Sequence, residues 1–283
     1  MRIYIKNKKV KLELVMKKIV MVVAAFATLA LSFSACKKVE KVDNSLNALK
    51  ERGVFVLGLD ASFPPMGYTD DDGNIIGYDI DLAKEVASRL GVEFKAQPID
   101  WDAKEMELST GKIDCIWNGF TMSEERSKAL AFTRPYLAND QVVVVKKDSG
   151  FNNLKDLAGK KVGLQTGSSA QDAVESNEEF KKSLKELVYF KDNMTALNDL
   201  AVGGIDAVVM DSVVANYSIA QTKKPLILLS ESLAKESYGV GFRKNDVKLR
   251  DEVQKILDEM DQDGTVANIS TKWFGSNISV ISK

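Results

Sequence analysis

The stretch Ile-Asp-Cys-Ile-Trp-Asn-Gly-Phe-Thr-Met-Ser-Glu-Glu-Arg, residues 113–126, decides how this chain is interpreted. An apolar strand ends at Asn118-Gly119, a hydroxyl follows at Thr121, and a Ser-Glu-Glu run can open a helix with Arg126 in its first turn. Gly119 lets the backbone approach a ligand closely, and the Arg126 fork can pair bidentately with a carboxylate. The stretch therefore predicts a carboxylate receptor; the alternative is a surface helix start with a solvated arginine.

The composition narrows the class of protein. The 283 residues suffice for two modest domains, and 45% hydrophobic with 28% charged residues indicates a folded chain. The net charge of -1 argues against nucleic acid as the main partner. There is no histidine and there are only two cysteines, which excludes His-based triads and thiolate metal cages. We expect neither a metal nor a cofactor.

The amino terminus is typical of an export signal. Lys17 and Lys18 precede an apolar run over residues 19–31, which is too short to span a membrane comfortably. Small residues then lead to Cys36, and the pattern resembles a bacterial lipoprotein signal in which that cysteine is lipidated. Phe33 stands where leucine is usual, and an ordinary secretory signal is the alternative.

The chain boundaries at this end follow from the same pattern. Met16-Lys17-Lys18 is a more natural start than Met1, so residues 1–15 are interpreted as an upstream extension. We expect the signal to occupy residues 1–35 and a polar, lysine-rich tether to occupy residues 36–47. Cys115 lies in an apolar strand, which favours a role in the core over chemistry.

Two cycles of strand and helix follow the tether. The first is expected at residues 54–59 (strand), 79–90 (helix), 92–98 (strand), 101–111 (helix) and 113–117 (strand). The second starts with a strand at 139–147 and continues through 161–164, 187–190, 205–210 and 226–229, with helices between, one of them over 170–179. An amphipathic helix over 248–262 and a helix over 266–274 end the chain. This order predicts parallel sheets covered by helices, with ligands at the carboxyl ends of the strands.

A resemblance extends this interpretation. The motifs Val56–Pro65, Gly77–Ala83 and Ile113–Arg126, with Phe132–Tyr136, Gly167–Ser169 and Asp263–Thr265, are similar in order and spacing to those of the family 3 extracellular solute-binding proteins. The resemblance covers almost the whole mature chain, from about Leu46 to Gly275. Members of this family serve ABC importers of polar amino acids.

The resemblance implies a periplasmic-binding-protein-like α/β fold with two lobes, two crossover strands and an interlobe ligand cleft that closes by hinge motion. The crossovers are expected near residues 137–140 and 236–240. The expected domains are lobe 1 (first part) at 48–138, lobe 2 at 139–237 and lobe 1 (second part) at 238–283.

The resemblance also implies which groups hold the ligand. Arg126 would bind the α-carboxylate, while Thr121 and the Gly119 carbonyl would take the α-ammonium and one carboxylate oxygen. Ser168 and Ser169 would donate backbone amides from a helix start in lobe 2. The complementary anion is Asp211, at the end of the strand over 205–210, which would pair with the α-ammonium.

Several further positions have two interpretations. Phe63 stacks on the ligand or plugs the core beneath its loop, and Trp101 at a helix start is expected to form a wall of the site. Asp60 either meets the ligand side chain or anchors its own loop as an Asx-turn. Asn118 satisfies backbone in its turn and can also touch ligand, and Trp117 is either core or wall.

The expected function is capture of a polar L-amino acid by a lipid-anchored, monomeric receptor that delivers it to an ABC permease. Arginine, lysine or glutamine are the favoured ligands, and cystine is an alternative. Two other functions stay open at this point: an exported enzyme resembling cyclohexadienyl dehydratase, with a carboxyl group for proton transfer, and a ligand-binding sensor subunit.

Overall fold

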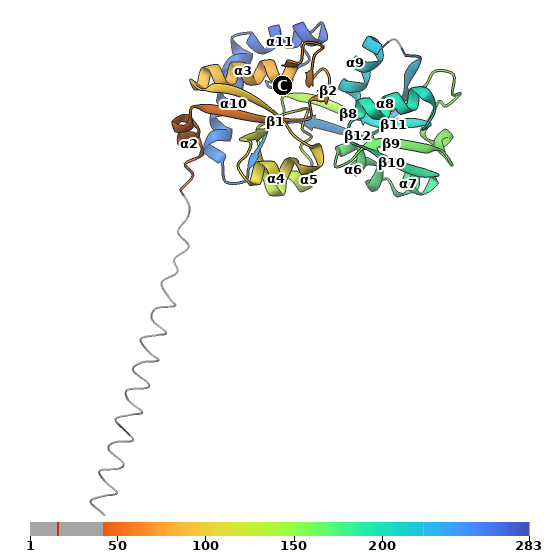
Figure 1. The fold of residues 1–283 in the computed structure, drawn as a ribbon, viewed down its shortest axis with the longest axis horizontal. Helices are drawn as coiled ribbons and strands as arrows, with labels where there is room; N and C mark the ends of the chain where they lie inside the picture. The colour runs from red at the N-terminus through yellow and green to blue at the C-terminus, as the bar shows by residue number, and fades with distance from the viewer. Residues whose placement is uncertain (1–15, 17–41, 223, 283) are drawn as a thin grey trace, which may run out of the picture. The chain divides into compact units, whose positions relative to one another are not determined.

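The computed structural model describes Met16 and residues 42–222 and 224–282 (Figure 1). Apart from Met16, the expected signal segment lies outside the described residues, and so do the expected lipidation site Cys36 and the first half of the expected tether, residues 36–41. Residues 45–47, which were expected to end the tether, begin helix α2 (Ser45–Arg52). Among the described residues no helix is both long enough and apolar enough to span a bilayer.

The first lobe is built on a five-stranded mixed sheet in the order β5-β1-β6-β13-β7. β1 lies parallel to β5 and β6, whereas β13 lies antiparallel to β6 and β7. Its strands are β1 (Val54–Leu59), β5 (Glu93–Pro98), β6 (Cys115–Ile116), β7 (Leu130–Phe132) and β13 (Gly241–Arg243), with a small second sheet of β2 (Ser62–Phe63), β3 (Gly67–Thr69) and β4 (Ile75–Ile76).

Helices from both ends of the chain surround these strands (Figure 1). Besides α2 they are α3 (Tyr78–Leu90), the 3-10 turn η1 (Trp101–Ala103), α4 (Lys104–Ser109), α5 (Glu124–Ala129), α10 (Val247–Gln262) and α11 (Thr265–Phe274). α10 buries the apolar stripe that its sequence predicted, including Leu249, Val253 and Leu257. This packing brings the carboxyl-terminal helices back onto the first lobe.

The second lobe has its own five-stranded sheet, in the order β10-β9-β11-β8-β12. Its strands are β8 (Leu137–Lys146), β9 (Lys161–Gln165), β10 (Glu186–Phe190), β11 (Ala207–Asp211) and β12 (Leu226–Tyr238). Its helices are η2 (Leu154–Leu157), α6 (Ser169–Ser176), α7 (Glu178–Ser183), α8 (Asn193–Val202) and α9 (Ser212–Thr222).

Two connections join the lobes. β8 follows β7 out of the first sheet, and β12 leads back into β13 of that sheet (Figure 1). The two connections pair with each other in antiparallel register, Leu137 with Tyr238 and Asp140 with Lys235. The expected fold class, two α/β lobes joined by two crossover strands, is confirmed.

Three expectations about single elements were wrong in detail. The strand expected at 226–229 continues to Tyr238, because irregular pairing with β8 carries it past its apolar part. The helix expected over 170–179 divides at Asn177, whose side chain accepts a hydrogen bond from the Phe180 backbone and starts α7. The sheets are mixed and not purely parallel, because β8, β12 and β13 run back between the lobes.

Candidate functional site

One cavity gathers all of the residues that the sequence proposed for ligand binding. It lies where β1, β6, β9 and β11 end and where α5 and α6 begin. Its lining consists of Asp60, Phe63, Trp101, Asn118, Gly119, Thr121, Arg126, Ser168, Ser169 and Asp211, together with Gln165. Gln165 is the one lining residue that the sequence analysis missed.

The Arg126 guanidinium is fixed by its place at the start of α5. The Ser123 hydroxyl accepts a hydrogen bond from the Arg126 backbone N–H at 3.2 Å and so caps the helix. Arg126 is only 7% exposed. Its Nη1 donates to the Thr121 carbonyl at 3.2 Å, its Nη2 donates to the Gly167 carbonyl of the second lobe at 3.3 Å, and it lies over the Phe120 ring. Burial lowers the pKa of Arg126, but a guanidinium stays charged in proteins.

The turn at Gly119 is stabilised by the buried carboxyl group of Asp79. Gly119 has φ +57°, and a Cβ there would lie 2.9 Å from the Phe63 ring and 3.1 Å from the Tyr238 ring, so glycine is required. Asp79 Oδ2 accepts hydrogen bonds from the Gly119 N–H at 2.7 Å and from the Tyr136 hydroxyl at 3.0 Å. Burial raises the pKa of Asp79 to about 7.

Asp60 anchors its loop and also reaches across to the second lobe. Its Oδ1 accepts from the Ser62 N–H at 2.9 Å, which confirms the Asx-turn interpretation. Its Oδ2 accepts from Gln165 Nε2 at 2.8 Å. Asn118 Oδ1 accepts from the Asp60 N–H at 2.9 Å, so Asn118 satisfies backbone as expected. Burial raises the pKa of Asp60, because charging a buried carboxyl is unfavourable.

Trp101 lines the cavity and packs beside Lys104, a basic residue that the sequence analysis did not propose for the site. Trp101 is 9% exposed and packs edge-to-face on Phe120. Lys104 Nζ lies 5.1 Å from the centre of the Trp101 ring and donates to the Gly167 carbonyl at 2.9 Å across the lobes. Burial, followed by the charge of Arg126, lowers the pKa of Lys104 to about 8. Trp117 is fully buried in the core.

Two serines begin α6 on the second-lobe side. The Ser168 hydroxyl caps the helix by accepting from the Gln171 N–H at 3.3 Å, and it donates to the Gln165 carbonyl at 2.7 Å. The Ser169 hydroxyl lies 3.1 Å from the Thr121 hydroxyl of the first lobe. Backbone amides at such a helix start carry partial positive charge, which suits a carboxylate.

Asp211 is the buried anion of the second lobe, at the end of β11. Its Oδ1 accepts hydrogen bonds from Asn139 Nδ2 at 2.7 Å, Gln141 Nε2 at 3.0 Å and the Tyr238 hydroxyl at 2.6 Å. Burial, followed by the nearby Glu236 carboxylate, raises the pKa of Asp211 to about 7. A cation placed beside Asp211 would favour its charged form.

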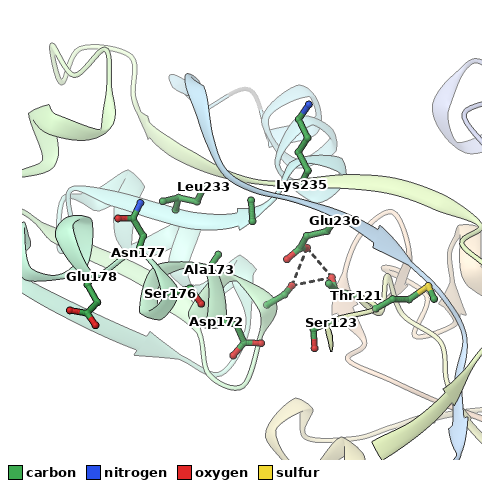
Figure 2. A pocket seen from close by; sticks show the side chains of 13 residues that line it. Thr121, Ser123, Asp172, Ala173, Ser176, Asn177, Glu178, Leu233, Lys235 and Glu236 are labelled. Carbon is green, nitrogen blue, oxygen red and sulfur yellow. Dashed lines mark hydrogen bonds between the residues drawn. The ribbon is translucent and has the colours of Figure 1, made fainter. Parts of the chain in front are cut away.

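Glu236 of the crossover strand β12 accepts hydrogen bonds from two residues that line the cavity, Thr121 and Ser169. Its Oε2 accepts from the Thr121 hydroxyl at 2.9 Å, Gln141 Nε2 at 3.0 Å, Asn139 Nδ2 at 3.2 Å and the Ser169 hydroxyl at 3.3 Å. Figure 2 shows Glu236 and Thr121 pointing toward each other beside a polar groove of about 530 Å³. Thr121 and Ser169 line both this groove and the cavity, so they form the wall between them.

The cavity itself measures about 10 Å³, the space of roughly one water molecule. Hydrogen bonds between the lobes, such as Gln165 to Asp60, hold its walls together. A larger guest therefore enters only when the lobes separate or these side chains turn. Within the described residues, no cluster of three or more metal-ligating side chains is present.

The cavity combines the buried Arg126 guanidinium, two buried carboxyl groups, those of Asp60 and Asp211, and oriented dipoles from both lobes. Comparison with known proteins gives this arrangement its context: residues 55–276 match the model of the bacterial extracellular solute-binding proteins, family 3. The chain belongs to this family.

Three similar proteins illustrate what members bind. The L-cystine-binding protein TcyJ of Escherichia coli K12 is 33% identical over 83% of this chain and 87% of its own length. The arginine-binding extracellular protein ArtP of Bacillus subtilis 168 is 31% identical over 92% of this chain and 98% of its own length. A crystal structure of an ABC uptake transporter substrate-binding protein from Streptococcus pneumoniae with bound histidine aligns with a TM-score of 0.82 and 37% identity, over 84% of this chain and 99% of that one.

Proposed function

We propose that this family member binds a polar L-amino acid in the cavity between its lobes and delivers it to an ABC permease. The observation that carries the proposal is that Arg126 of the first lobe and Asp211 of the second line the same buried cavity. An amino acid is a zwitterion, so it needs one fixed cation and one fixed anion. A receptor that divides the two between its lobes binds well only when closed.

Each group has a defined task in this proposal. Arg126 holds the α-carboxylate, aided by the amides of Ser168 and Ser169 at the start of α6. Asp211 holds the α-ammonium, with the Thr121 hydroxyl and the Gly119 carbonyl completing the contacts. Charge-assisted hydrogen bonds of this kind contribute about 1.5–3 kcal/mol each once they are desolvated.

The far end of the cavity selects the ligand side chain. Phe63 and Trp101 offer apolar walls, and the Asp60 carboxylate and Gln165 amide offer polar groups between them. These groups suit a cationic or amide side chain, so arginine, lysine and glutamine are the favoured ligands. Cystine stays an alternative, since this chain is similar to the L-cystine-binding protein TcyJ.

Closure couples the ligand to the lobes. The zwitterion makes contacts with both lobes only in the closed form, so binding shifts the population toward that form. The closed form is what we propose the permease recognises. We also propose that lipid at Cys36 anchors a monomeric, exported chain to the bacterial membrane surface, on its periplasmic or extracellular face, and that no reaction is catalysed.

Isothermal titration against the common amino acids tests the proposal. The wild-type chain is expected to bind one or a few polar amino acids with a Kd in the micromolar range or below. Arg126→Ala is expected to weaken binding by roughly 30-fold to several thousandfold, because breaking a buried charge pair costs about 2–5 kcal/mol. Arg134→Ala is the matched control, because Arg134 is half-exposed and pairs with Asp258 away from the cavity. Full-strength binding by Arg126→Ala would contradict the assigned carboxylate site.

The enzyme alternative has its own experiment. Incubation of the purified chain with prephenate or arogenate should leave both substrates unchanged. Formation of an aromatic product would contradict the transport proposal and would show that the chain is a dehydratase.

A further inference from the structure

Tyr238 lies where the crossover strand β12 meets the ligand cavity, with its hydroxyl on Asp211. It is the last residue of β12 and has no exposed surface. Its carbonyl accepts from the Tyr136 N–H of the other connection at 2.9 Å, and its backbone forms a β-bridge with Thr121 of the first lobe. Tyr238 is therefore held between the two connections of the hinge.

The Tyr238 side chain contacts groups from both lobes. Its ring lies against Gly119, where a Cβ would come within 3.1 Å of it. Its hydroxyl donates to Asp211 Oδ1 at 2.6 Å. The two other donors to that oxygen, Asn139 and Gln141, also reach Oδ1, and none of the three donates to Oδ2.

We propose that Tyr238 is a positioning residue: its hydroxyl ties the Asp211 carboxylate to the crossover strand and keeps Oδ2 available for the ligand ammonium. This inference rests on the proposed function, in which Asp211 holds that ammonium. It adds a physical link between the binding site and the hinge, because β12 is one of the two strands that must bend when the lobes close.

The charges around Asp211 explain why the hydroxyl matters. Glu236 faces Asp211 from β12 and opposes its ionisation, whereas Arg126 of α5 supplies the opposite charge. Asn139 and Gln141 on β8 are neutral donors. The Tyr238 hydrogen bond stabilises the charged carboxylate. Removing it raises the pKa of Asp211 further, so the site loses its anion at neutral pH and regains it at higher pH.

Tyr238→Phe in the full chain tests this, with Tyr136→Phe as the matched control. Both tyrosines are fully buried, and both donate to a buried carboxyl group, Asp211 and Asp79 respectively. L-arginine, L-lysine, L-glutamine and L-cystine are titrated calorimetrically from pH 6 to pH 8.5. Tyr238→Phe is expected to bind roughly fivefold more weakly at pH 7, with its affinity midpoint shifted about one pH unit upward, and to approach wild-type affinity at pH 8.5. Tyr136→Phe is expected to keep the wild-type midpoint.

The outcomes separate the two proposals. If the wild-type chain binds none of the four amino acids, the proposed function fails. If the wild-type chain binds but Tyr238→Phe keeps the wild-type midpoint, or is weaker by one constant factor at every pH, the positioning role is overturned. Should Tyr238→Phe fail to fold, 3-fluorotyrosine at position 238 strengthens the donor and should move the midpoint downward; an unchanged midpoint then refutes the role.

Discussion

The two halves of the cavity are built in different ways. The first-lobe half comes largely from one continuous stretch, in which Gly119, Thr121 and Arg126 follow strand β6. The cation there is bound by backbone carbonyls, those of Thr121 and Gly167. The second-lobe half places its anion, Asp211, among side chains drawn from two other strands.

This difference shows which parts of the fold position Arg126 and which position Asp211. The place of Arg126 depends on local chain geometry, a helix start directly after a turn, and one of its two carbonyl acceptors, that of Gly167, comes from the second lobe. The anion depends on the pairing of β8 with β11 and β12, because its three side-chain donors stand on those strands. The second half is therefore the one that responds to movement of the connections between the lobes.

Within this comparison, the largest expected effect on binding comes from substituting one of two similar buried acids, Asp211 and Asp79. Asp211 and Asp79 are both buried, both accept a tyrosine hydroxyl, and burial raises the pKa of each to about 7. Asp211→Asn should weaken amino acid binding by roughly a hundredfold, about 2.7 kcal/mol, because the ammonium loses its counter-charge. Asp79→Asn should stay within about threefold, since an amide carbonyl can still accept from the Gly119 N–H. Calorimetric titration of both variants decides; equal losses would show that the carboxylates have the same role.

The first-lobe half of the site could be predicted from the sequence because its groups lie close together along the chain. Strand end, glycine, hydroxyl and helix start occur in consecutive residues, so Gly119, Thr121 and Arg126 could be proposed together. The periodicity of apolar residues likewise predicted α3 and α10 almost to their ends. Such patterns report local structure, and local structure positions these groups.

The missed residues depend on contacts far along the chain. Glu236 and Tyr238 follow the apolar part of β12, and their role appears only through irregular pairing with β8. Lys104 looks like a solvated lysine at a helix start, and it becomes buried because Gly167 of the other lobe approaches it. Gln165 ends a strand two residues before Gly167, which was a usable signal, but its contact with Asp60 exists only between the lobes.

The next largest expected effect is the pH dependence of binding, which tests whether the titrating group lies in the first or the second lobe. Asp211 has a pKa of about 7, raised by burial and by Glu236, so below pH 7 it takes up a proton and loses the charge that the ammonium needs. Affinity is expected to be close to its maximum at pH 8 and to fall roughly tenfold by pH 6. Asp79 titrates in the same range beneath Gly119. The Asp79→Asn variant should therefore keep the pH dependence and Asp211→Asn should lose it; the reverse pattern would place the titrating group in the first lobe.

A smaller effect is expected at the far end of the cavity, where Asp60 of the first lobe meets Gln165 of the second. Asp60→Asn should weaken arginine and lysine binding by roughly tenfold, about 1.4 kcal/mol, because the ligand cation loses a charged acceptor. Glutamine binding should change by less than about threefold. Asp72→Asn, in an exposed turn, is the matched control. Equal losses for cationic and neutral ligands would mean that Asp60 acts only through its Asx-turn.

The smallest expected effect concerns the second cation of the first lobe, Lys104. Its ammonium donates to the Gly167 carbonyl across the lobes, which favours closure. Burial, and after it the charge of Arg126, lowers the pKa of Lys104. Lys104→Met keeps the apolar stem against Trp101 and removes the charge, so the lost donor and the relieved repulsion partly offset each other. We expect affinity to fall by only about threefold, measured against Lys112→Met, whose lysine is exposed and pairs with Glu107. A tenfold or larger loss would mean that the first lobe needs two cations to hold one carboxylate, and that Arg126 alone does not define its half of the site.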